Sequence, residues 1–227
     1  MNAVDRISVV KVDFHTHTQF SRDCLIKPKE LIAKAEKLGI IPAITDHDSI
    51  GAHRGLRESG AAFIPGEEIG TDKGDLIGLY VSQAIPKKTP FLEAIDLIHS
   101  QGGLAYLPHM FDVTRKGVAV PELAKKADII EVFNARSVMK NFNIKADEFA
   151  KANNIPGAAG SDSHFLSEFG TTYTELPGFD IDNIGSPKEL MKALRSESKK
   201  IVGKPAPLHV KGTTTIVKFW KKLTKKS

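Results

Sequence analysis

The chain is poor in cysteine and has no long hydrophobic run. Cys24 is the only cysteine among 227 residues, which excludes an internal disulfide framework. No uninterrupted apolar stretch is long enough to cross a bilayer, and no apolar run follows a basic patch near the first residue. These absences predict a cytoplasmic protein without a transmembrane segment or a signal peptide.

Acidic residues are absent from the end of the chain. Residues 199–227 contain nine lysines and no aspartate or glutamate. Because the net charge of the whole chain is +5, the first 198 residues carry about −4. The body is therefore mildly acidic, as a site lined with carboxylates would make it, and only the tail is basic.

Aromatic residues are also scarce, at 7% of the chain. This scarcity argues against a long track for single-stranded nucleic acid, because such tracks stack bases on aromatic side chains. The rest of the composition is ordinary for a globular protein, with 41% hydrophobic and 26% charged residues. The length suffices for one large α/β domain with a sizeable core.

Two histidines close the first apolar stretch. Residues 12–18 read V-D-F-H-T-H-T and follow Val9 and Val10, so this β-branched and aromatic segment is expected to be a strand. Side chains two positions apart on a strand point to the same side, which places His15 beside His17. Two adjacent imidazoles can bind one metal ion, although such a pair is also consistent with polar residues on a solvated strand.

Strand-like and helix-like segments alternate along the rest of the chain. Strands are expected at residues 41–45, 61–64, 76–81, 104–107, 129–133 and 156–159, and helices at 28–39, 90–101, 142–153 and 187–196, with a short one ending at residue 58. This alternation predicts parallel β/α units in a closed barrel or an open doubly wound sheet. No glycine-rich phosphate loop follows the first strand, so a nucleotide-binding sheet is disfavoured.

Residues that commonly bind metals are concentrated where these strands end. They are His15, His17, His47, Glu68, His109, Asp162 and His164. In β/α barrels and doubly wound sheets this edge carries the active site. Imidazoles and carboxylates without thiolates suit Zn, Mn or Fe, and the set exceeds the ligands of one tetrahedral ion. The sequence therefore predicts a site for two or three divalent transition-metal ions.

Other residues of the same types are expected to have no chemical role. His53, His99 and His209 fall in predicted helices or in the tail. Glu67 is interpreted as a surface carboxylate, and Cys24 as a residue outside the reaction.

The ordered motifs resemble those of the PHP (polymerase and histidinol phosphatase) family. They read D-F-H-T-H-T, I-T-D-H-D, P-G-E-E-I, P-H and G-S-D-S-H, and the resemblance extends over about residues 10–175. It implies an α/β fold, a distorted (β/α)7 barrel, and a phosphoesterase with a di- or trinuclear metal site.

The resemblance also implies a role for each ligand. Three sets follow from it: His15, His17 and Asp162 for the first ion; Glu68, as a bridge, and His109 for the second; and Asp23, His47 and His164 for the third. Asp75 stands where many family members have a histidine, and it either replaces that imidazole or is a turn residue. Asp13 and Asp46 either orient the ligand histidines or are solvated at the strand ends.

Hydrolysis of a phosphate ester is the expected function, with a small phosphorylated molecule or a nucleotide as substrate. Bound metal ions lower the pKa of water from about 15.7 towards about 7, which supplies hydroxide at neutral pH. Glu68 and Asp162 are expected to be catalytic as metal ligands. Arg136 would hold the substrate phosphate, or else form a surface salt bridge. Arg22, Arg115 and Lys116 are weaker candidates.

Two other functions remain open. One is a nuclease acting on nucleotides or short single strands, which the same metal ions would serve. The other is a non-catalytic, metal-binding regulatory module, which the nearly complete ligand set argues against.

The chain is expected to divide into a phosphoesterase domain, residues 1–200, and a basic extension, residues 201–227. Within the extension, residues 214–226 place Ile216, Phe219, Trp220 and Leu223 at helical spacing among lysines. The favoured interpretation is an amphipathic helix docked on the barrel through this apolar stripe. The alternative is a helix that binds an anionic membrane or nucleic acid.

Overall fold

The computed structural model describes residues 8–224, apart from the side chains of residues 208–213 and 215. Its strands are β1 Val9–Thr16, β2 Ile40–Ile44, β3 Ile64–Gly70, β4 Asp75–Leu79, β5 Leu104–Leu107, β6 Ile129–Asn134, β7 Gly157–Gly160, β8 Tyr173–Pro177 and β9 Lys200–Val202. Its α-helices are α1 Pro28–Leu38, α2 His53–Glu58, α3 Phe91–Ser100, α4 Pro121–Ala124, α5 Lys140–Ala152, α6 Pro187–Leu194 and α7 Leu208–Thr224, with 3₁₀ turns at Val113–Arg115 and Ile181–Asn183.

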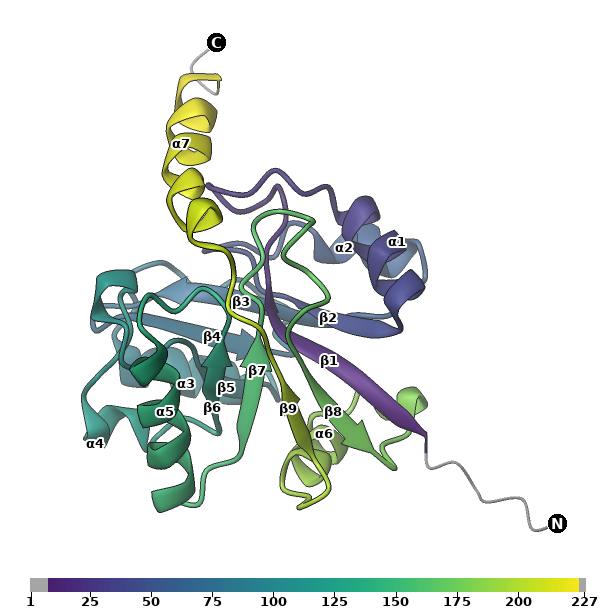
Figure 1. Ribbon diagram of the computed structural model, residues 1–227, viewed down its shortest axis with the longest axis vertical. Helices are drawn as coiled ribbons and strands as arrows, with labels where there is room; N and C mark the ends of the chain where they lie inside the picture. The colour runs from purple at the N-terminus through teal and green to yellow at the C-terminus, as the bar shows by residue number, and fades with distance from the viewer. Residues whose placement is uncertain (1–7, 225–227) are drawn as a thin grey trace, which may run out of the picture.

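The strands form one curled sheet in the order β7-β6-β5-β4-β3-β2-β1-β8-β9. Strands β1 to β7 make a ring that nearly closes where the segment after β7 reaches β1. There the Asp162 amide donates to the His15 carbonyl at 2.7 Å, and the His17 amide donates to the Ser163 carbonyl at 3.1 Å. The helices cover the outside, with α3, α4 and α5 at the left of Figure 1 and α1 and α2 at the right. The predicted α/β fold, a distorted (β/α)7 barrel, is confirmed.

The expectation of uniformly parallel strands is wrong at β4, which is antiparallel to both β3 and β5. Only four residues separate β3 from β4, and the Thr71 amide closes the turn by donating to the Gly74 carbonyl at 3.0 Å. A turn this short leaves no room for the helix that a parallel connection needs. Gly70 consequently pairs with Asp75, and the start of β4 lies at the same rim as the end of β3.

The third strand also lies later in the chain than the sequence predicts. It runs through Pro65 and Gly66, past the end expected at residue 64, so Glu68 is inside β3 and not beyond it. A side chain at Gly66 would bring a Cβ within 3.1 Å of the Gly78 carbonyl and 3.0 Å of Thr45. The glycine therefore permits close strand packing here and does not mark a turn.

Two strands that the sequence did not predict extend the sheet beyond the ring. Strand β8 runs antiparallel to β1, with Val10 opposite Leu176, and β9 runs antiparallel to β8. They cover the edge of β1 that the ring leaves open.

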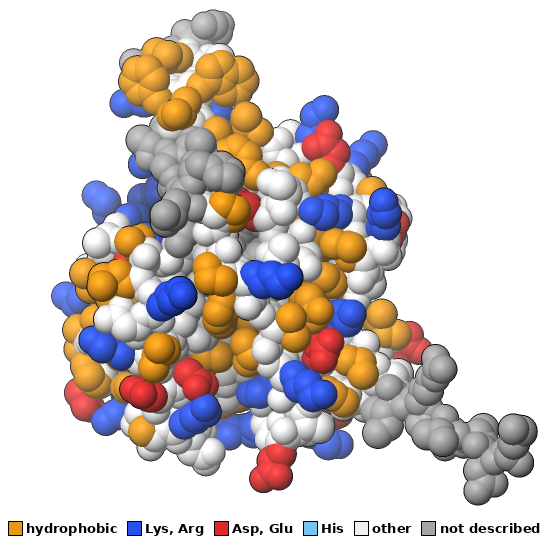
Figure 2. Space-filling model, in the orientation of Figure 1, with side chains coloured by type: hydrophobic (Ala, Val, Ile, Leu, Met, Phe, Trp, Pro, Cys, Tyr) orange, Lys and Arg blue, Asp and Glu red, His pale blue; other side chains and the backbone are white. Residues whose placement is uncertain are grey.

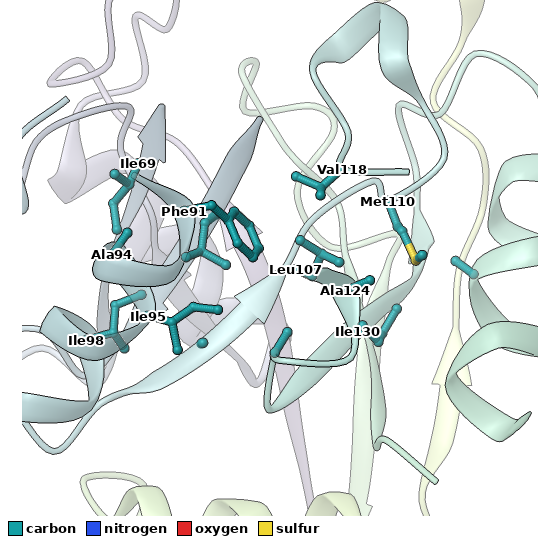
Figure 3. Packing of buried hydrophobic residues seen from close by; sticks show 14 of the residues in the cluster. Ile69, Phe91, Ala94, Ile95, Ile98, Leu107, Met110, Val118, Ala124 and Ile130 are labelled. Carbon is teal, nitrogen blue, oxygen red and sulfur yellow. The ribbon is translucent and has the colours of Figure 1, made fainter. Parts of the chain in front are cut away.

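The barrel interior is filled by side chains. The rings of Phe14 on β1 and Tyr106 on β5 stack with their centroids 6.0 Å apart, and both are fully buried. Outside the ring, helix α3 contributes Phe91, Ile95 and Ile98 to a second cluster against the strands (Figure 3). Burying each large apolar side chain contributes about 1.5–3 kcal/mol. Because the interior is packed, the rim is where a ligand can bind.

Helix α1 follows its sequence signals closely. Pro28 occupies its first turn, and Gly39 ends it in the left-handed conformation with φ of 63°. The predicted apolar stripe is buried at Leu31, Ile32 and Ala35.

The basic tail forms helix α7, which projects beyond the barrel at the top of Figure 1. Its apolar stripe is exposed, by 69% at Ile216, 65% at Phe219, 53% at Trp220 and 55% at Leu223. The expectation that this stripe packs on the barrel is therefore wrong. The last two residues of the predicted helix, 225 and 226, lie outside the described residues.

Among residues 8–224, no helix is both long enough and apolar enough to traverse a lipid bilayer.

Candidate metal centre

A cavity of about 350 Å³ opens at the rim of the barrel where the strand ends meet. Its lining combines acidic, imidazole and basic side chains: Asp23, Glu68 and Asp75; His47, His109 and His164; Arg22, Arg115, Lys116 and Arg136; and Thr114, Val138 and Thr214. His, Asp and Glu side chains form three groups at or below the floor of this cavity. Within each group, the potential metal-binding atoms all lie within 4.8 Å of one another.

The first group joins the two ends of the ring. His15 and His17 come from the end of β1, and Asp162 comes from the segment after β7. The Nε2 atoms of the two histidines are 3.1 Å apart, and Asp162 Oδ1 lies 3.4 Å from Nε2 of His17. All three side chains are at most 1% exposed. The predicted first set of ligands is thus brought together.

Glu68 lies at the centre of the cavity floor. Its Oε2 is 3.4 Å from Nε2 of both His15 and His17 and 2.8 Å from Nδ1 of His47. Its Oε1 is 3.2 Å from Nε2 of His109. The two oxygens of one carboxylate therefore face different groups of histidines, which is the geometry expected of a bridging ligand.

The second group consists of Glu68, Asp75 and His109. Asp75 reaches it because β4 is antiparallel and starts at this rim. Of the two roles considered for Asp75, the position beside Glu68 and His109 favours the ligand, although the residue also begins a strand directly after a turn.

The third group consists of His17, His47 and His164. Asp23, the remaining predicted ligand, lies beside it, with Oδ1 3.3 Å from Nε2 of His164 and Oδ2 3.6 Å from Nε2 of His47. His17 thus stands between the first and third groups, and its ring centroid is 4.2 Å from that of His164.

The hydrogen bonds of His15 and His17 imply a positive charge between their Nε2 atoms. Nδ1 of His15 faces Glu131 at 3.1 Å, and Nδ1 of His17 faces the Ser21 hydroxyl at 3.0 Å. If both Nδ1 atoms carry the proton, the two Nε2 atoms present lone pairs to each other at 3.1 Å. A proton or a metal ion must lie between them.

The spacing of the donor atoms fits a metal ion. Two ligands about 2.1 Å from one tetrahedral ion lie about 3.4 Å apart, close to the separations seen here. Oε2 of Glu68, Oδ1 of Asp162 and Oδ1 of Asp23 are buried and make no hydrogen bond. The groups that face them are the histidines His47, His17 and His164, at 2.8, 3.4 and 3.3 Å. Buried, unpaired carboxylate oxygens are costly unless a cation satisfies them. The residues present therefore suit transition-metal ions.

The electrostatics agree with this conclusion. Burial opposes the charge on His15, but Asp162, Glu131 and Glu68 outweigh it and raise the pKa of His15 well above its ordinary value. Burial and the neighbouring Glu68 raise the pKa of Asp75. The shift of His15 reflects the buried carboxylates around it, and that of Asp75 reflects first its burial and then Glu68. Bound cations would neutralise this buried negative charge.

Two candidate ligands have strained backbones. His109 has φ of 32° and Asp162 has φ of 54°, in the left-handed region that L-residues seldom adopt. Such conformations cost on the order of 1–3 kcal/mol each and are concentrated at functional sites.

Glu131 is a site residue that the sequence analysis did not identify. Besides facing His15, it accepts from the His109 amide at 2.7 Å through Oε2 and from the Asn134 side chain at 2.9 Å. A side chain at Gly160 would put a Cβ 2.3 Å from Glu131 and 2.4 Å from His15. The contact between His15 and Glu131 thus depends on a glycine at position 160.

The two candidate orienting aspartates act in different ways. Asp46 Oδ1 accepts from the Ser21 hydroxyl at 2.7 Å, and Ser21 in turn faces His17, so Asp46 orients His17 through Ser21. Asp13 accepts from the backbone amides of His15 and Ser161 and fixes the chain, not an imidazole. Both are buried, so the alternative of solvation at the strand ends is wrong.

The arginines differ from expectation. Arg136 lines the cavity, but it is 4% exposed and pairs with Glu168 at 3.3 Å, so its salt bridge is buried and not at the surface. Arg115 contacts Asp162 and donates to Asn134 at 3.0 Å. Arg115 therefore contacts a candidate metal ligand directly.

Glu67 is not the surface carboxylate that was expected. It is fully buried on β3, and its Oε2 accepts from the Ile85 amide at 2.8 Å. Burial raises its pKa to about 7. Its side chain points away from the candidate metal groups, because neighbouring residues on a strand face opposite sides.

The chain matches two family models. Residues 13–132 match the PHP domain, and residues 140–198 match a region described as PHP-associated. An uncharacterized protein of Methanocaldococcus jannaschii is 36% identical over 203 residues, which cover 85% of this chain and 82% of that protein.

Solved structures share the fold at lower identity. A two-domain protein of Bacteroides vulgatus, described as containing a predicted PHP-like metal-dependent phosphoesterase, has a TM-score of 0.66 at 18% identity, over 88% of this chain and 66% of that one. PsfC of Pseudomonas syringae has a TM-score of 0.65 at 15% identity, over 95% of this chain and 99% of that one. This chain spans just under two thirds of the Bacteroides protein.

Proposed function

The chain belongs to the PHP family, and on that premise we propose that it hydrolyses phosphate monoesters of a small molecule or nucleotide with two or three bound Zn, Mn or Fe ions. The observation that supports this proposal is how the charged side chains are arranged in the cavity. Carboxylates and imidazoles form its floor, while Arg22, Arg115, Lys116 and Arg136 line it as well.

The charges of a phosphate monoester complement this arrangement of side chains. Its phosphoryl oxygens carry up to two negative charges, which need cations on more than one side. The bound ions would act as Lewis acids and lower the pKa of a bound water. Arg115 and Lys116, which are less buried than Arg136, would bind the outer phosphoryl oxygens.

The chain's own residues would divide the remaining work. Glu68 and Asp162 are proposed as the ligands on which the rate depends most, because each presents a buried oxygen without a hydrogen-bond partner to the centre. Asp75, His109 and the three groups of histidines and aspartates described above complete the proposed ligand set. Arg136 keeps its proposed contact with the phosphate, while its pairing with Glu168 also supports the segment that carries His164, whose amide donates to Glu168 at 2.9 Å.

The size of the cavity favours a small substrate over a nucleic-acid strand. About 350 Å³ is at the lower end of small-molecule sites. Binding along a strand needs an extended basic groove with stacking side chains, and the described residues that line this cavity include no Phe, Tyr or Trp. These features support a phosphomonoesterase over the nuclease alternative.

The test is a substrate panel on metal-free and reloaded protein. Protein stripped with a chelator and reloaded with Mn, Fe(II) or Zn should release phosphate from sugar, nucleotide and aryl monoesters. Parallel reactions contain an aryl phosphodiester and a dinucleotide, and the Glu68→Gln variant controls for contaminating phosphatases. Faster cleavage of the dinucleotide would favour the nuclease, and metal binding without hydrolysis of any ester would favour the regulatory module.

A further inference from the structure

Helix α7 contacts the barrel through its polar side. The Lys221 ammonium donates to the carbonyls of Gln19 and Ser21, both at 2.7 Å, and Thr214 lines the cavity at the rim. An α-helix turns about 100° per residue, so Thr214 and Lys221, seven positions apart, lie within about 20° of each other. They define the side of α7 that faces the protein.

The apolar side of α7 points the opposite way. Ile216, Phe219, Trp220 and Leu223 fall within an arc of about 100°, centred about 160° from the side that carries Thr214 and Lys221. All four are more than half exposed. Figure 2 shows hydrophobic side chains gathered on the upper part of α7, beyond the body of the protein. Because this side faces away from the barrel, the barrel cannot cover it in the observed arrangement.

The charge around this apolar side is of one sign. Lys218 and Lys222 are exposed on α7, and the sequence of the helix contains no acidic residue. The whole stretch of residues 199–227 carries nine lysines without an aspartate or glutamate. A partner for this side must therefore accept apolar side chains and be negatively charged.

We propose that α7 is a membrane-surface helix whose apolar side lies in the interface of a bilayer containing anionic lipid. A narrow apolar stripe that includes tryptophan and phenylalanine, together with lysines and low overall hydrophobicity, is the pattern of helices that lie in the headgroup region without crossing it. Tryptophan favours that depth, and lysines near an anionic leaflet add about 1 kcal/mol each.

Two other occupants fit the helix less well. Nucleic acid would satisfy the lysines and could stack on Trp220, but it offers no partner for Ile216 and Leu223. A second copy would provide the groove of about 1160 Å³ beside α5, but that groove is itself basic, with Lys140, Lys151, Arg195 and Lys199 against Asp147. Bringing a lysine-rich helix to it would be opposed by like charges.

Trp220 is the only tryptophan in the chain, so its fluorescence reports on α7 alone. The full-length protein is mixed with neutral phosphatidylcholine vesicles and with vesicles that contain about 30% phosphatidylglycerol, at about 0.1 M salt. The emission should shift to shorter wavelength, and the protein should co-sediment, with the anionic vesicles only. Raising the salt to about 0.5 M should weaken the binding, because screening shortens the range of the lysine attraction.

The Phe219→Ser/Leu223→Ser variant keeps Trp220 and every lysine. It should bind the anionic vesicles at least about tenfold more weakly, because two large side chains no longer enter the interface. Ile181→Ser, at a residue that is 50% exposed away from α7, is the matched control and should bind as the wild type does. Equal binding by Phe219→Ser/Leu223→Ser and the wild type would overturn the proposal.

Three further results would also overturn it. One is the absence of co-sedimentation with the anionic vesicles. The second is a stable dimer in lipid-free sedimentation that shields Trp220 from a soluble quencher. The third is binding to a short DNA duplex that is tighter than vesicle binding and unaffected by the two serines. None of these measurements depends on hydrolysis, so the proposal stands or falls separately from the proposed activity.

Discussion

Oε1 of Glu131 lies 3.1 Å from Nδ1 of His15. The same carboxylate accepts from the backbone amide of His109, so one buried residue on β6 supports candidate ligands on β1 and after β5. A carboxylate behind a ligand histidine fixes the tautomer, turns the ring and increases the basicity of the atom that binds the metal.

Glu131→Gln should therefore lower metal affinity or activity by about 10- to 100-fold, while the fold is retained. The amide keeps an oxygen for the His109 amide but removes the negative charge behind His15. Metal titration and phosphate release measure the effect, and Glu36→Gln, on the exposed side of α1, is the control. If Glu131→Gln titrated and turned over like the wild type, the orienting role would be wrong.

Glu68 and Glu67 form a natural pair for comparison, because they are neighbours on β3 with opposite surroundings. Glu68→Gln should lose at least about a hundredfold in rate, since the central carboxylate that faces four histidines is neutralised. Glu67→Gln should change the rate little, because glutamine still accepts from the Ile85 amide and Glu67 is readily protonated at neutral pH, with its pKa raised to about 7. Equal losses in the two variants would show that the wrong residue has been assigned to the centre.

Protein purified without chelator should contain more than one Mn, Fe or Zn ion per chain by elemental analysis. His15→Gln should lower this content, because it removes the donor atom that faces both His17 and Glu68. His99→Gln should leave it unchanged, since His99 is exposed and pairs with Asp128. Metal removal should also lower the thermal midpoint, because a ligand at about 100 times its Kd stabilises by about 2.7 kcal/mol. Less than one equivalent after metal is added back would contradict the assignment.

Substitutions of Arg115 and Arg136 should have different effects on KM and on the thermal midpoint. Arg115→Gln should raise KM for a phosphate monoester at least about tenfold with little change in the thermal midpoint, because its guanidinium is the less buried of the two. Arg136→Gln should lower the thermal midpoint, because it removes the cation that pairs with the buried Glu168 carboxylate, at a cost of about 3–5 kcal/mol. The reverse pattern would show that Arg136, and not Arg115, contributes more to binding of the phosphate.

His53 should make stability depend on pH. Burial lowers its pKa, and its Nε2 lies 3.0 Å from the Gly66 carbonyl. The unfolded chain takes up a proton near the ordinary value of 6.5, but the folded protein resists it, so stability is full above that pH and falls below it. Between about pH 7.5 and about pH 5.5, chelator-treated wild type should lose more stability to urea unfolding than His53→Gln does. Parallel losses would show that other groups carry the dependence.

The sequence predicted the residues of the candidate site better than it predicted the directions of the strands around them. Chain order and local spacing suffice to place His15, His17, His47 and His164 at strand ends, and the structure brings all four together. The direction of β4 was missed because a turn of four residues is hard to distinguish from the start of a longer connection.

Glu131 and the burial of Glu67 were missed for a different reason. Both lie inside strands, where the sequence pattern gives the side of the strand but not what packs against it. Glu131 becomes a site residue only because Gly160, 29 positions later, leaves space for its contact with His15.

The tail illustrates the same limit. Helical spacing predicted α7 and its apolar stripe, and both are present. Which side of the helix meets the barrel depends on the carbonyls that Lys221 finds at Gln19 and Ser21, about 200 residues away. Periodicity within the helix carries no information about those partners.

The closure of the ring between β1 and β7 has a consequence for the order of events during synthesis. The first histidines leave the ribosome early, yet Asp162 and His164, which complete two of the candidate metal groups, follow about 145 residues later. Synthesis proceeds at about 5–20 residues per second, so His15 and His17 are made about 7–30 seconds before these partners. The candidate centre is complete only where the segment after β7 meets β1, so closure of the barrel also assembles the proposed binding site.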